Sequence, residues 1–512
     1  MAKPGGPGST PRHTATNFDD NDDDPDLDEL ERRVLELKRE LERARLTRDR
    51  ALSRRAPMRK VPNELLARVF ELGAYGDIFF ATTLCEVNRH WRDLAIVTPS
   101  VWANVVLNPQ WQLGIDAFLR RMTVFLERAQ HCLLLVDLDL YCVDNEQRAH
   151  DVLQAIAPHV SRCFSFSISV PQPEWMDFIG QHFGGEMATK MEKMALRFKP
   201  TSPWAAAYVQ STILQGAMPL LHTLCLEGLP LTILDAALPG LRTLEYKQFE
   251  DLYSYPQNSA AITPLSDLTN LLRLSESLEE LKVEYCSFCT PDESLFGDPD
   301  PQVPLRKLAS LTIGYVDAGF ATLLMEAIDA PNLTKLSLRC DPMRQHQDSW
   351  WIPVNWSPLR GLTSLYLDGF RILDGSPLIA LVKLLSVTQQ LRTLSIHTPV
   401  TIANHTTASP QFFAGLSKQN RQGQWLCPYL VDFTIINCSA VTGQELLNIV
   451  RARDQALNVA TIGSLTIKEC TSFDVMMLDE LVQHVQYLTH VPPTSPPVIP
   501  PTPNWNHGSF FT

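Results

Sequence analysis

The sequence predicts an α/β protein in which one long helix and a short helical module precede an extended array of strand–helix repeats. Three observations lead to this fold class. Apolar residues alternate at spacings of three and four in residues 27–56. They recur at helical spacing in residues 57–107. A pattern of the form LxxLxL then returns roughly every 20 to 40 residues through residues 191–487.

The two ends of the chain are predicted to be disordered. Residues 1–26 are rich in Gly, Pro, Ser, Thr and Asp, and residues 488–512 are rich in Pro. Neither composition can bury enough apolar area to offset the entropy that ordering costs. The Pro-rich end is expected to be an extended polyproline-type chain, with docking to a Pro-binding module as the alternative.

A heptad pattern in residues 27–56 predicts a helix with an apolar seam. The seam consists of Leu27, Leu30, Val34, Leu37, Leu41 and Ala44. It covers about three heptads, which is near the lower limit for a stable coiled coil. Two interpretations remain open: a solvated helix that leads into the next module, or weak self-association through residues 27–46. A basic-zipper DNA reader is disfavoured because its basic region precedes the heptads, whereas here the basic residues follow them.

Residues 57–107 predict two short helices with a broad apolar face. Pro62 suits the first position of a helix, and Gly73 is expected to end it. The first helix carries Leu65, Leu66, Val69, Phe70 and Leu72 at helical spacing. The second is expected to carry Leu84, Val87, Trp91, Leu94 and Ala95 on one face. A unit of about 40 to 50 residues is marginally stable alone, so we expect this face to dock onto a partner or a neighbouring domain.

The same residues carry a family resemblance. The motifs PxxLLxxVF, LxxVxxxWRxLA and TPxVW, which run from Pro62 to Trp102, resemble the F-box of large fungal F-box families. Asn88 departs from that pattern, which often has Cys at this position. In the family, the module binds the Skp-type adaptor of a cullin–RING ubiquitin ligase. The adaptor-binding residues implied by the resemblance are Pro62, Leu65, Leu66, Val69, Phe70, Leu84, Val87, Trp91 and Leu94.

The longest part of the chain predicts repeated strand–helix units. Residues 108–190 are expected to form a linker with irregular first repeats, with strands near 133–143 and 162–170 and helices around 115–130 and 145–157. Copies of LxxLxL then begin at Met191, Leu221, Leu241, Leu278, Leu308, Leu333, Leu362, Leu391, Leu430 and Ile462. Each unit can bury its leucines only by stacking on its neighbours.

These repeats resemble the leucine-rich repeats that follow the F-box in some F-box proteins. Cys286, Cys438 and Cys470 each fall three residues after the last apolar position of the motif, where such repeats place Asn or Cys at the bend after the strand. Because side chains alternate along a strand, the third, fifth and seventh positions are expected to line the concave face, which would bind substrate. The candidate substrate face comprises Glu245, Lys282, Glu284, Lys335, Arg339, Tyr366, Asp368 and His397, with Glu227, Lys247, Asp432 and Lys468 at equivalent positions.

Composition argues against several functional classes. The formal net charge of −13 over 512 residues disfavours general affinity for nucleic acid or an anionic membrane. No apolar run approaches the roughly 18 to 20 residues that a membrane span needs. Eleven cysteines and no signal-peptide pattern predict reduced thiols in the cytosol or nucleus. Cys286 and Cys289 lack a second Cys or His pair at zinc-like spacing, and no HExxH, GxSxG or phosphate-cradling motif is present, so no cofactor is expected.

The two resemblances together imply a substrate-recognition subunit of a Skp–cullin–F-box ubiquitin ligase. The F-box would dock the Skp-type adaptor and, through it, the cullin and RING subunits, while the repeats bind a protein substrate. The RING subunit and its conjugating enzyme would carry the chemistry, so this chain is expected to be non-catalytic. The alternative is a protein-interaction scaffold that uses the repeat surface without ligase coupling.

Overall fold

The structure is a computed structural model, and it describes residues 25–55, 60–75, 77–109, 111, 113–143, 145–182, 188–198, 214–215, 218–235, 238–248, 265–286, 302–316, 318–340, 356–372, 374–399, 409–439 and 441–493. The chain divides into two compact units, Met1–Leu72 and Gly73–Thr512, and each is described by itself. The predicted disordered ends lie mostly outside the described residues. The boundary at residue 488 is wrong, because strand β18 spans Tyr487–Val491 and pairs with the strand before it.

The first unit contains helix α1, Pro25–Arg55, and most of helix α2, Asn63–Ala74. α1 covers the stretch for which the heptad pattern predicts a helix. Exposed ion pairs one turn apart, such as Arg33 with Glu36 at 2.7 Å, add a small stabilisation to it. α2 begins directly after Pro62, whose carbonyl accepts hydrogen bonds from the backbone of Leu65 and Leu66. Proline at this position leaves no donor unsatisfied, because the first N–H groups of a helix have no intrahelical acceptor.

The second unit begins with two short helices where one was predicted. α3 spans Phe80–Val87 and α4 spans Arg89–Ile96, followed by a 3₁₀ turn, η2, at Pro99–Trp102. The helix is interrupted at Asn88, whose backbone is extended (φ −166°, ψ 172°) and whose side chain accepts a hydrogen bond from the Trp91 N–H. Asn88 is therefore the N-cap of α4, a position that favours Asn.

Gly73 does not end α2, which continues to Ala74. A Cβ at Gly73 would lie 2.3 Å from the ring of Phe80, so this glycine permits close packing against α3. The Ala74 carbonyl accepts a hydrogen bond from the Asn104 side chain at 2.8 Å, which satisfies one of the last carbonyls of the helix.

The described strands of the second unit form one 14-stranded sheet in which every neighbouring pair is parallel. Its strands, in order across the sheet, are β1 (Asn104–Leu107), β2 (Leu134–Asp139), β3 (Cys163–Val170), β4 (Lys193–Phe198), β6 (Thr223–Glu227), β8 (Thr243–Lys247), β9 (Glu280–Glu284), β11 (Ser310–Gly314), β13 (Lys335–Arg339), β14 (Ser364–Asp368), β15 (Thr393–His397), β16 (Asp432–Ile436), β17 (Ser464–Lys468) and β18 (Tyr487–Val491). Two short parallel pairs lie apart from it: β5 (Leu214–Gln215) with β7 (Leu234–Asp235), and β10 (Val303–Pro304) with β12 (Ile328–Asp329).

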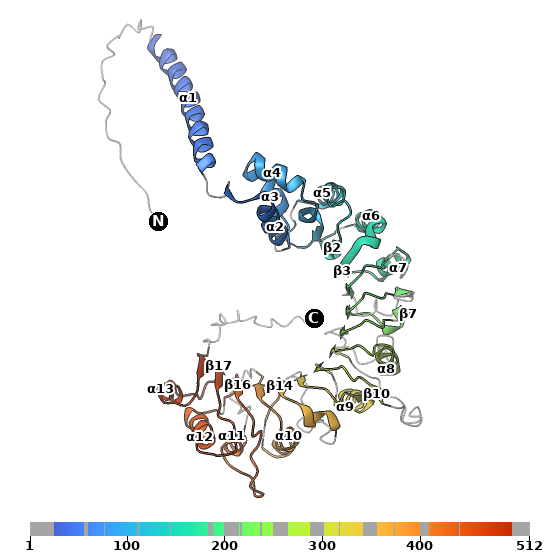
Figure 1. The fold of residues 1–512 in the computed structure, drawn as a ribbon, viewed down its shortest axis with the longest axis vertical. Helices are drawn as coiled ribbons and strands as arrows, with labels where there is room; N and C mark the ends of the chain where they lie inside the picture. The colour runs from blue at the N-terminus through green and yellow to red at the C-terminus, as the bar shows by residue number, and fades with distance from the viewer. Residues whose placement is uncertain are drawn as a thin grey trace, which may run out of the picture. The chain divides into compact units, whose positions relative to one another are not determined.

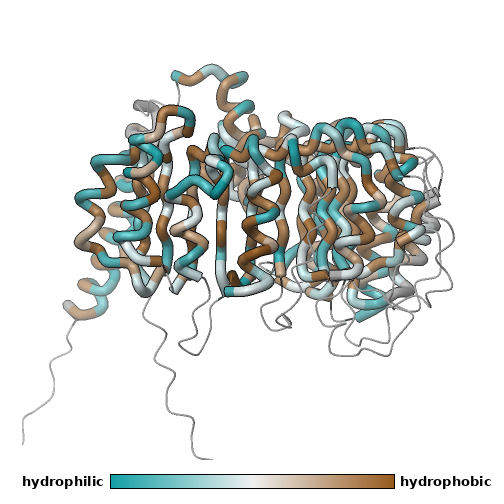
Figure 2. Tube along the Cα trace, turned by 90° about the horizontal axis from the view of Figure 1, so that it is seen from below, coloured by the Kyte–Doolittle hydropathy of each residue, from teal (hydrophilic) through white to brown (hydrophobic). Residues whose placement is uncertain are grey.

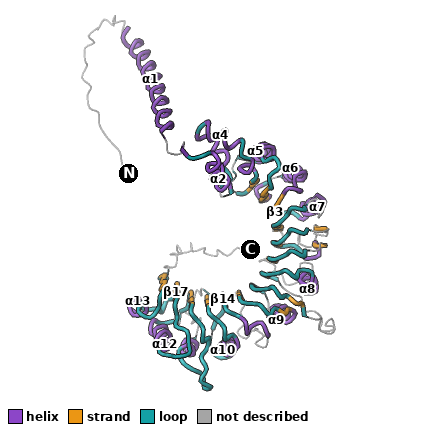
Figure 3. Tube along the Cα trace, viewed as in Figure 1, coloured by secondary structure: helices purple, strands orange, loops and turns teal. Residues whose placement is uncertain are grey.

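Helices and 3₁₀ turns connect these strands. The helices are α5 (Ile115–Arg128), α6 (Glu146–Ile156), α7 (Pro173–His182), α8 (Leu265–Arg273), α9 (Ala318–Ala327), α10 (Ser376–Val387), α11 (Pro410–Leu416), α12 (Gly443–Asp454) and α13 (Leu478–Leu481). The 3₁₀ turns are η3 (Leu140–Cys142), η4 (Ala157–Arg162), η6 (Leu231–Ile233), η10 (Ser357–Gly361) and η11 (Val475–Met477). Within the second unit, these connecting helices lie on one side of the sheet, and no helix of the described residues covers its other side (Figures 1 and 3).

The leucines of the repeated motif make the core of this unit. Each of the ten predicted LxxLxL copies contains a strand of the sheet. Their fourth positions are direct neighbours across the strands, for example Leu281, Leu311 and Leu336, and all three are fully buried. Hydrophobic and hydrophilic stretches accordingly alternate along the trace (Figure 2). Stacked apolar rows of this kind are what parallel strands covered by helices require.

The sheet starts earlier than the sequence analysis placed it. β1, β2 and β3 precede residue 191 and continue the same parallel order into β4. The strands expected near 133–143 and 162–170 and the helices expected around 115–130 and 145–157 are present as β2, β3, α5 and α6. Residues 108–190, predicted to be a linker with irregular first repeats, therefore contain strands of the same sheet, as the repeat part of that prediction expected.

A left-handed residue follows six of these strands. These residues are Gly228, Tyr285, Tyr315, Gly369, Asn437 and Glu469, with φ between 54° and 77°. At each such bend, the backbone N–H donates to the carbonyl of the last residue of the next strand, as from Gly369 to His397 at 2.8 Å. The predicted bend cysteines are confirmed in place, since Cys286, Cys438 and Cys470 directly follow bend residues and are buried. Burial raises the pKa of the Cys470 thiol to about 11.

Candidate functional site

Helix α2 has two apolar stripes with different environments. Leu66 and Phe70 are buried, with 0% and 1% of their surface exposed. Leu65, Val69 and Leu72 recur four and three residues apart and are 58%, 54% and 60% exposed. Residues at this spacing share one helix face. We call these three residues the α2 face; Pro62, just before the helix, is exposed as well.

The predicted adaptor-binding residues of the second unit divide in the same way. Leu84 and Ala95 are buried, Trp91 and Leu94 are half-buried, and Val87 is exposed. The structure thus separates residues that the sequence pattern could not. Leu66, Phe70 and Leu84 are buried, whereas Leu65, Val69 and Val87 are exposed.

Trp102, the last residue of the TPxVW motif, is a packing residue. Its side chain is 1% exposed, and its indole N–H donates to the Ala95 carbonyl at 2.7 Å. The Arg128 guanidinium lies 4.3 Å from the centre of the Trp102 ring, a cation–π contact that joins α5 to the turn after α4.

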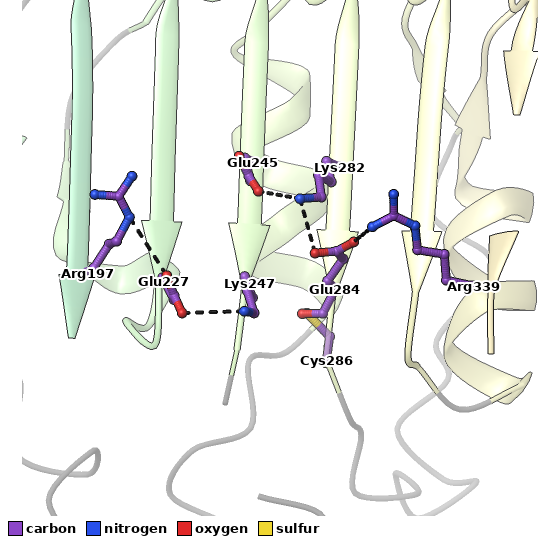
Figure 4. Close-up of polar contacts among 8 residues, drawn as sticks. All are labelled: Arg197, Glu227, Glu245, Lys247, Lys282, Glu284, Cys286 and Arg339. Carbon is purple, nitrogen blue, oxygen red and sulfur yellow. Dashed lines mark hydrogen bonds and ion pairs between the residues drawn. The ribbon is translucent and has the colours of Figure 1, made fainter. Parts of the chain in front are cut away.

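The seventh positions of successive motif copies form a row of alternating charge. In order across the strands, this charged row contains Arg197, Glu227, Lys247, Glu284 and Arg339 (Figure 4). Glu227 lies 3.8 Å from Arg197 on one side and 3.5 Å from Lys247 on the other. The charges are therefore largely neutralised by their neighbours, rather than gathered into a patch of one sign.

Glu284 is the most deeply buried member of the charged row. Its side chain is only 5% exposed, and its carboxylate lies 3.1 Å from Lys282 and 2.8 Å from Arg339. Lys282 also bonds Glu245 at 2.5 Å. Burial opposes the charge of Lys282, but its hydrogen bond to Glu245 and the charge of Glu284 raise its pKa overall. Two cations around one buried carboxylate supply the compensation that a desolvated charge needs.

Gly314 leaves room for the ion pair between Glu284 on β9 and Arg339 on β13, the two strands that flank β11. It occupies the seventh position between Glu284 and Arg339. A Cβ there would lie 3.1 Å from Glu284 Cγ and 3.3 Å from Arg339 Cβ. The missing side chain gives the guanidinium room to reach a carboxylate two strands away.

The remaining predicted face residues are paired further along the sheet. Lys335 Nζ lies 5.3 Å from the centre of the Tyr366 ring. His397 Nδ1 lies 2.6 Å from the Asp368 carboxylate, and its Nε2 lies 2.9 Å from the Asn437 amide. The hydrogen bond between His397 and Asp368 raises the pKa of His397 and lowers the pKa of Asp368. All eight predicted face residues therefore have polar or cation–π partners, although they form separate clusters.

Sequence reasoning missed two residues of this surface. Arg197 and Cys225 occupy the seventh and fifth positions of their motif copies, so the rule that selected the other residues would also have selected them. Burial, followed by the charge of Glu245, raises the pKa of the Cys225 thiol to about 11. A thiol with such a pKa is a poor nucleophile at neutral pH.

The pairing of His397 with Asp368 predicts a pH-dependent stability. Because the folded-state pKa of His397 is raised, its stabilisation is fully present below the unfolded-state pKa of about 6.5 and is lost as pH rises through the folded-state value. We expect His397→Gln to lower the free energy of unfolding more at about pH 6 than at about pH 9, measured by urea denaturation at both values. Asp368→Asn should remove the same pH dependence. Equal losses at the two pH values would contradict this assignment.

The described part of the chain contains no group of three or more His, Cys, Asp or Glu side chains placed to hold a metal ion. Cys289, the second residue of the Cys286-x-x-Cys289 pair, lies outside the described residues. Nor is any described helix both long enough and apolar enough to cross a membrane. Neither models of known protein families nor curated protein sequences give a match to this chain.

Proposed function

We propose that this chain is the substrate-recognition subunit of a Skp–cullin–F-box ubiquitin ligase, and that residues 57–107 are its F-box. The α2 face is the observation that carries the proposal. Leu65 and Val69 match the PxxLLxxVF motif, and together with Leu72 they form an exposed apolar stripe. Their sequence neighbours Leu66 and Phe70 are buried, so only this second apolar stripe of α2 is exposed to a partner.

Burial of the α2 face by a partner would stabilise the complex. Full burial of a leucine or valine side chain contributes about 1.5 to 3 kcal/mol. The three side chains of the α2 face are 54–60% exposed, so each could contribute part of this amount in a helix-in-groove contact with a protein that supplies an apolar surface. In our proposal that protein is the Skp-type adaptor. Val87 of the second unit is a separate candidate contact.

The sheet of the second unit is proposed to be a leucine-rich-repeat-like solenoid that binds a protein substrate. Its helix-free side carries paired side chains of both signs, including the charged row. Paired charges on a rigid sheet favour selectivity over non-specific attraction, because a partner must match the pattern of donors and acceptors. The chain would supply no chemistry itself; it would hold substrate lysines near a conjugating enzyme that the RING subunit recruits.

The α2 face predicts a specific effect on adaptor binding. We expect purified full-length chain to bind a purified Skp-type adaptor, and Leu65→Asp to weaken that binding by about 30-fold or more, because a charge would occupy the centre of an apolar contact. Biolayer interferometry measures the affinity. Leu457→Asp is the matched control, since Leu457 is 99% exposed and lies outside the proposed contact. Absence of binding by the wild-type chain, or equal binding by the folded Leu65→Asp variant, would contradict the proposal.

Protein turnover separates a ligase subunit from a scaffold. In cells that lack this chain, a substrate of the ligase is expected to have a longer half-life. The wild-type chain and Leu457→Asp should restore its turnover, whereas Leu65→Asp should not. A partner that binds the sheet but whose half-life never changes would support the scaffold alternative.

A further inference from the structure

Helix α1 exposes an apolar stripe along most of its length. Leu27, Leu30, Val34, Leu37 and Leu41 are each 49–59% exposed, and their spacings alternate between three and four. This spacing assigns Leu27, Val34 and Leu41 to the a positions of a heptad and Leu30, Leu37 and Ala44 to the d positions. The 31 residues of α1 correspond to roughly 46 Å of helix at 1.5 Å per residue. The stripe itself, from Leu27 to Ala44, covers 18 of these residues or about 27 Å, a length suited to packing against a second helix.

The charge of this region is strongly asymmetric. The first part of α1, residues 25–31, contains four carboxylates and no basic residue. Its last part, residues 43–55, contains six basic residues and one carboxylate. Two copies of the helix packed in parallel would place acidic segment against acidic segment and basic against basic. Packed antiparallel, each acidic segment would face a basic one, so the electrostatics favour the antiparallel pair.

The pairing of individual heptad positions also favours the antiparallel orientation. An antiparallel pair centred between Val34 and Leu37 has six apolar layers, in which Leu27 meets the partner's Ala44, Leu30 the partner's Leu41, and Val34 the partner's Leu37. At the flanking positions, Glu31 then meets the partner's Lys38, and Arg33 meets the partner's Glu40. Each of these pairs occurs twice by symmetry and is attractive.

The parallel alternative has unfavourable contacts. At its flanking positions, Arg33 would meet the partner's Lys38, which is repulsive, although Glu40 would meet the partner's Arg45 favourably. Arg48, which follows the seam at the next a position, would face its own counterpart across the core. In the antiparallel pair, Arg48 lies beyond the apolar layers and does not face its own counterpart.

We propose that α1 binds α1 of a second copy of this chain as an antiparallel two-stranded coiled coil. The charge asymmetry and the flanking pairs indicate that the partner helix is a second copy of α1, because an antiparallel copy complements both. This interface involves neither the α2 face nor the sheet, so the dimer and the proposed ligase function can be tested independently.

Sedimentation equilibrium of the full-length chain tests the seam. We expect the wild-type chain to form a concentration-dependent dimer. Leu37→Glu should raise the dimer dissociation constant by about 100-fold or more, because it buries two charges in adjacent core layers. Leu35→Glu is the matched control: Leu35 is similarly exposed but lies at position b, outside the seam, so its dimer should persist. A monomeric wild-type chain, or a dimer that Leu37→Glu leaves intact, would overturn the proposal.

A second variant tests the orientation. In the antiparallel pair, Lys38→Glu places a carboxylate opposite the partner's Glu31, so the dimer should weaken by roughly tenfold. Glu31→Lys combined with Lys38→Glu should restore it. In a parallel pair, Lys38→Glu would instead place the new carboxylate opposite the partner's Arg33 and tighten the dimer. Tightening would therefore overturn the antiparallel assignment, and circular dichroism of each variant would verify that α1 remains helical.

Discussion

Gly369→Ala is expected to destabilise the second unit by about 3 to 5 kcal/mol, through two effects that act together. Gly369 has φ of +77°, which an L side chain adopts only with strain. A Cβ at this position would also lie 2.1 Å from the Cys340 carbonyl oxygen, which belongs to the bend after the preceding strand. Because that oxygen is backbone, no side-chain rotation relieves the overlap. Urea denaturation followed by far-ultraviolet circular dichroism measures the loss.

Gly423→Ala separates the two effects. Gly423 has nearly the same conformation, φ +75°, but a Cβ there would meet nothing closer than Gln419 Oε1 at 4.0 Å. We expect only the conformational strain, about 1 to 2 kcal/mol. A similar loss for both variants would show that close packing of the bend backbone contributes nothing.

Arg453→Met is expected to stabilise the protein, by about 1 to 3 kcal/mol. Arg453 is fully buried in α12, and burial lowers the pKa of its guanidinium to about 10. Its Nη2 donates to the Cys427 carbonyl, while Nε and Nη1 have no hydrogen-bond partner among the described residues. Methionine removes the two unsatisfied donors and fills much of the same volume. The Cys427 carbonyl keeps an acceptor role, because the Leu430 N–H donates to it at 3.1 Å.

Arg451→Met is the matched control in the same helix. Arg451 pairs with Glu480 in a partly exposed ion pair. Exposed ion pairs contribute only about 0.2 to 1 kcal/mol, so this variant should be neutral or slightly destabilising. A destabilisation by Arg453→Met larger than that of Arg451→Met, in the same denaturation experiment, would contradict the prediction.

The strand positions were accessible from the sequence because one physical pattern repeats. Each LxxLxL copy buries its fourth and sixth positions with the period of a strand, and all ten copies contain strands; in β11 and β13 the intervening Thr312 and Ser337 are buried as well. β1, β2 and β3 alternate as well but lack the leucine frame, so the sheet was predicted to begin too late. The break at Asn88 was missed because the apolar spacing continues across it, and only the capping hydrogen bond to Trp91 marks the new helix.

The sequence predicted which residues line the candidate site, but not which of them contact one another. Glu284 and Arg339 were both assigned to the exposed rows, yet 55 residues separate them in sequence. Their contact depends on the lateral register of β9, β11 and β13, and on the absence of a side chain at Gly314. Likewise, both stripes of α2 are apolar, so composition alone could not distinguish the buried Leu66 from the exposed Leu65.

The bends after the strands have a consequence for how this surface can vary. After many of these strands, the N–H of the next residue donates to the main-chain carbonyl of a seventh-position residue on the neighbouring strand, and these acceptors include Lys247, Gly314, Asp368, His397 and Ile436. The same backbone contact is thus made beneath a cation, a hydrogen atom, an anion, an imidazole and an aliphatic chain. The main-chain hydrogen bonds therefore do not depend on which side chain occupies these positions. Most side chains at these positions can therefore be replaced without loss of the hydrogen bonds between neighbouring bends; Gly314 is the exception, because a Cβ there would lie 3.1 Å from Glu284 Cγ.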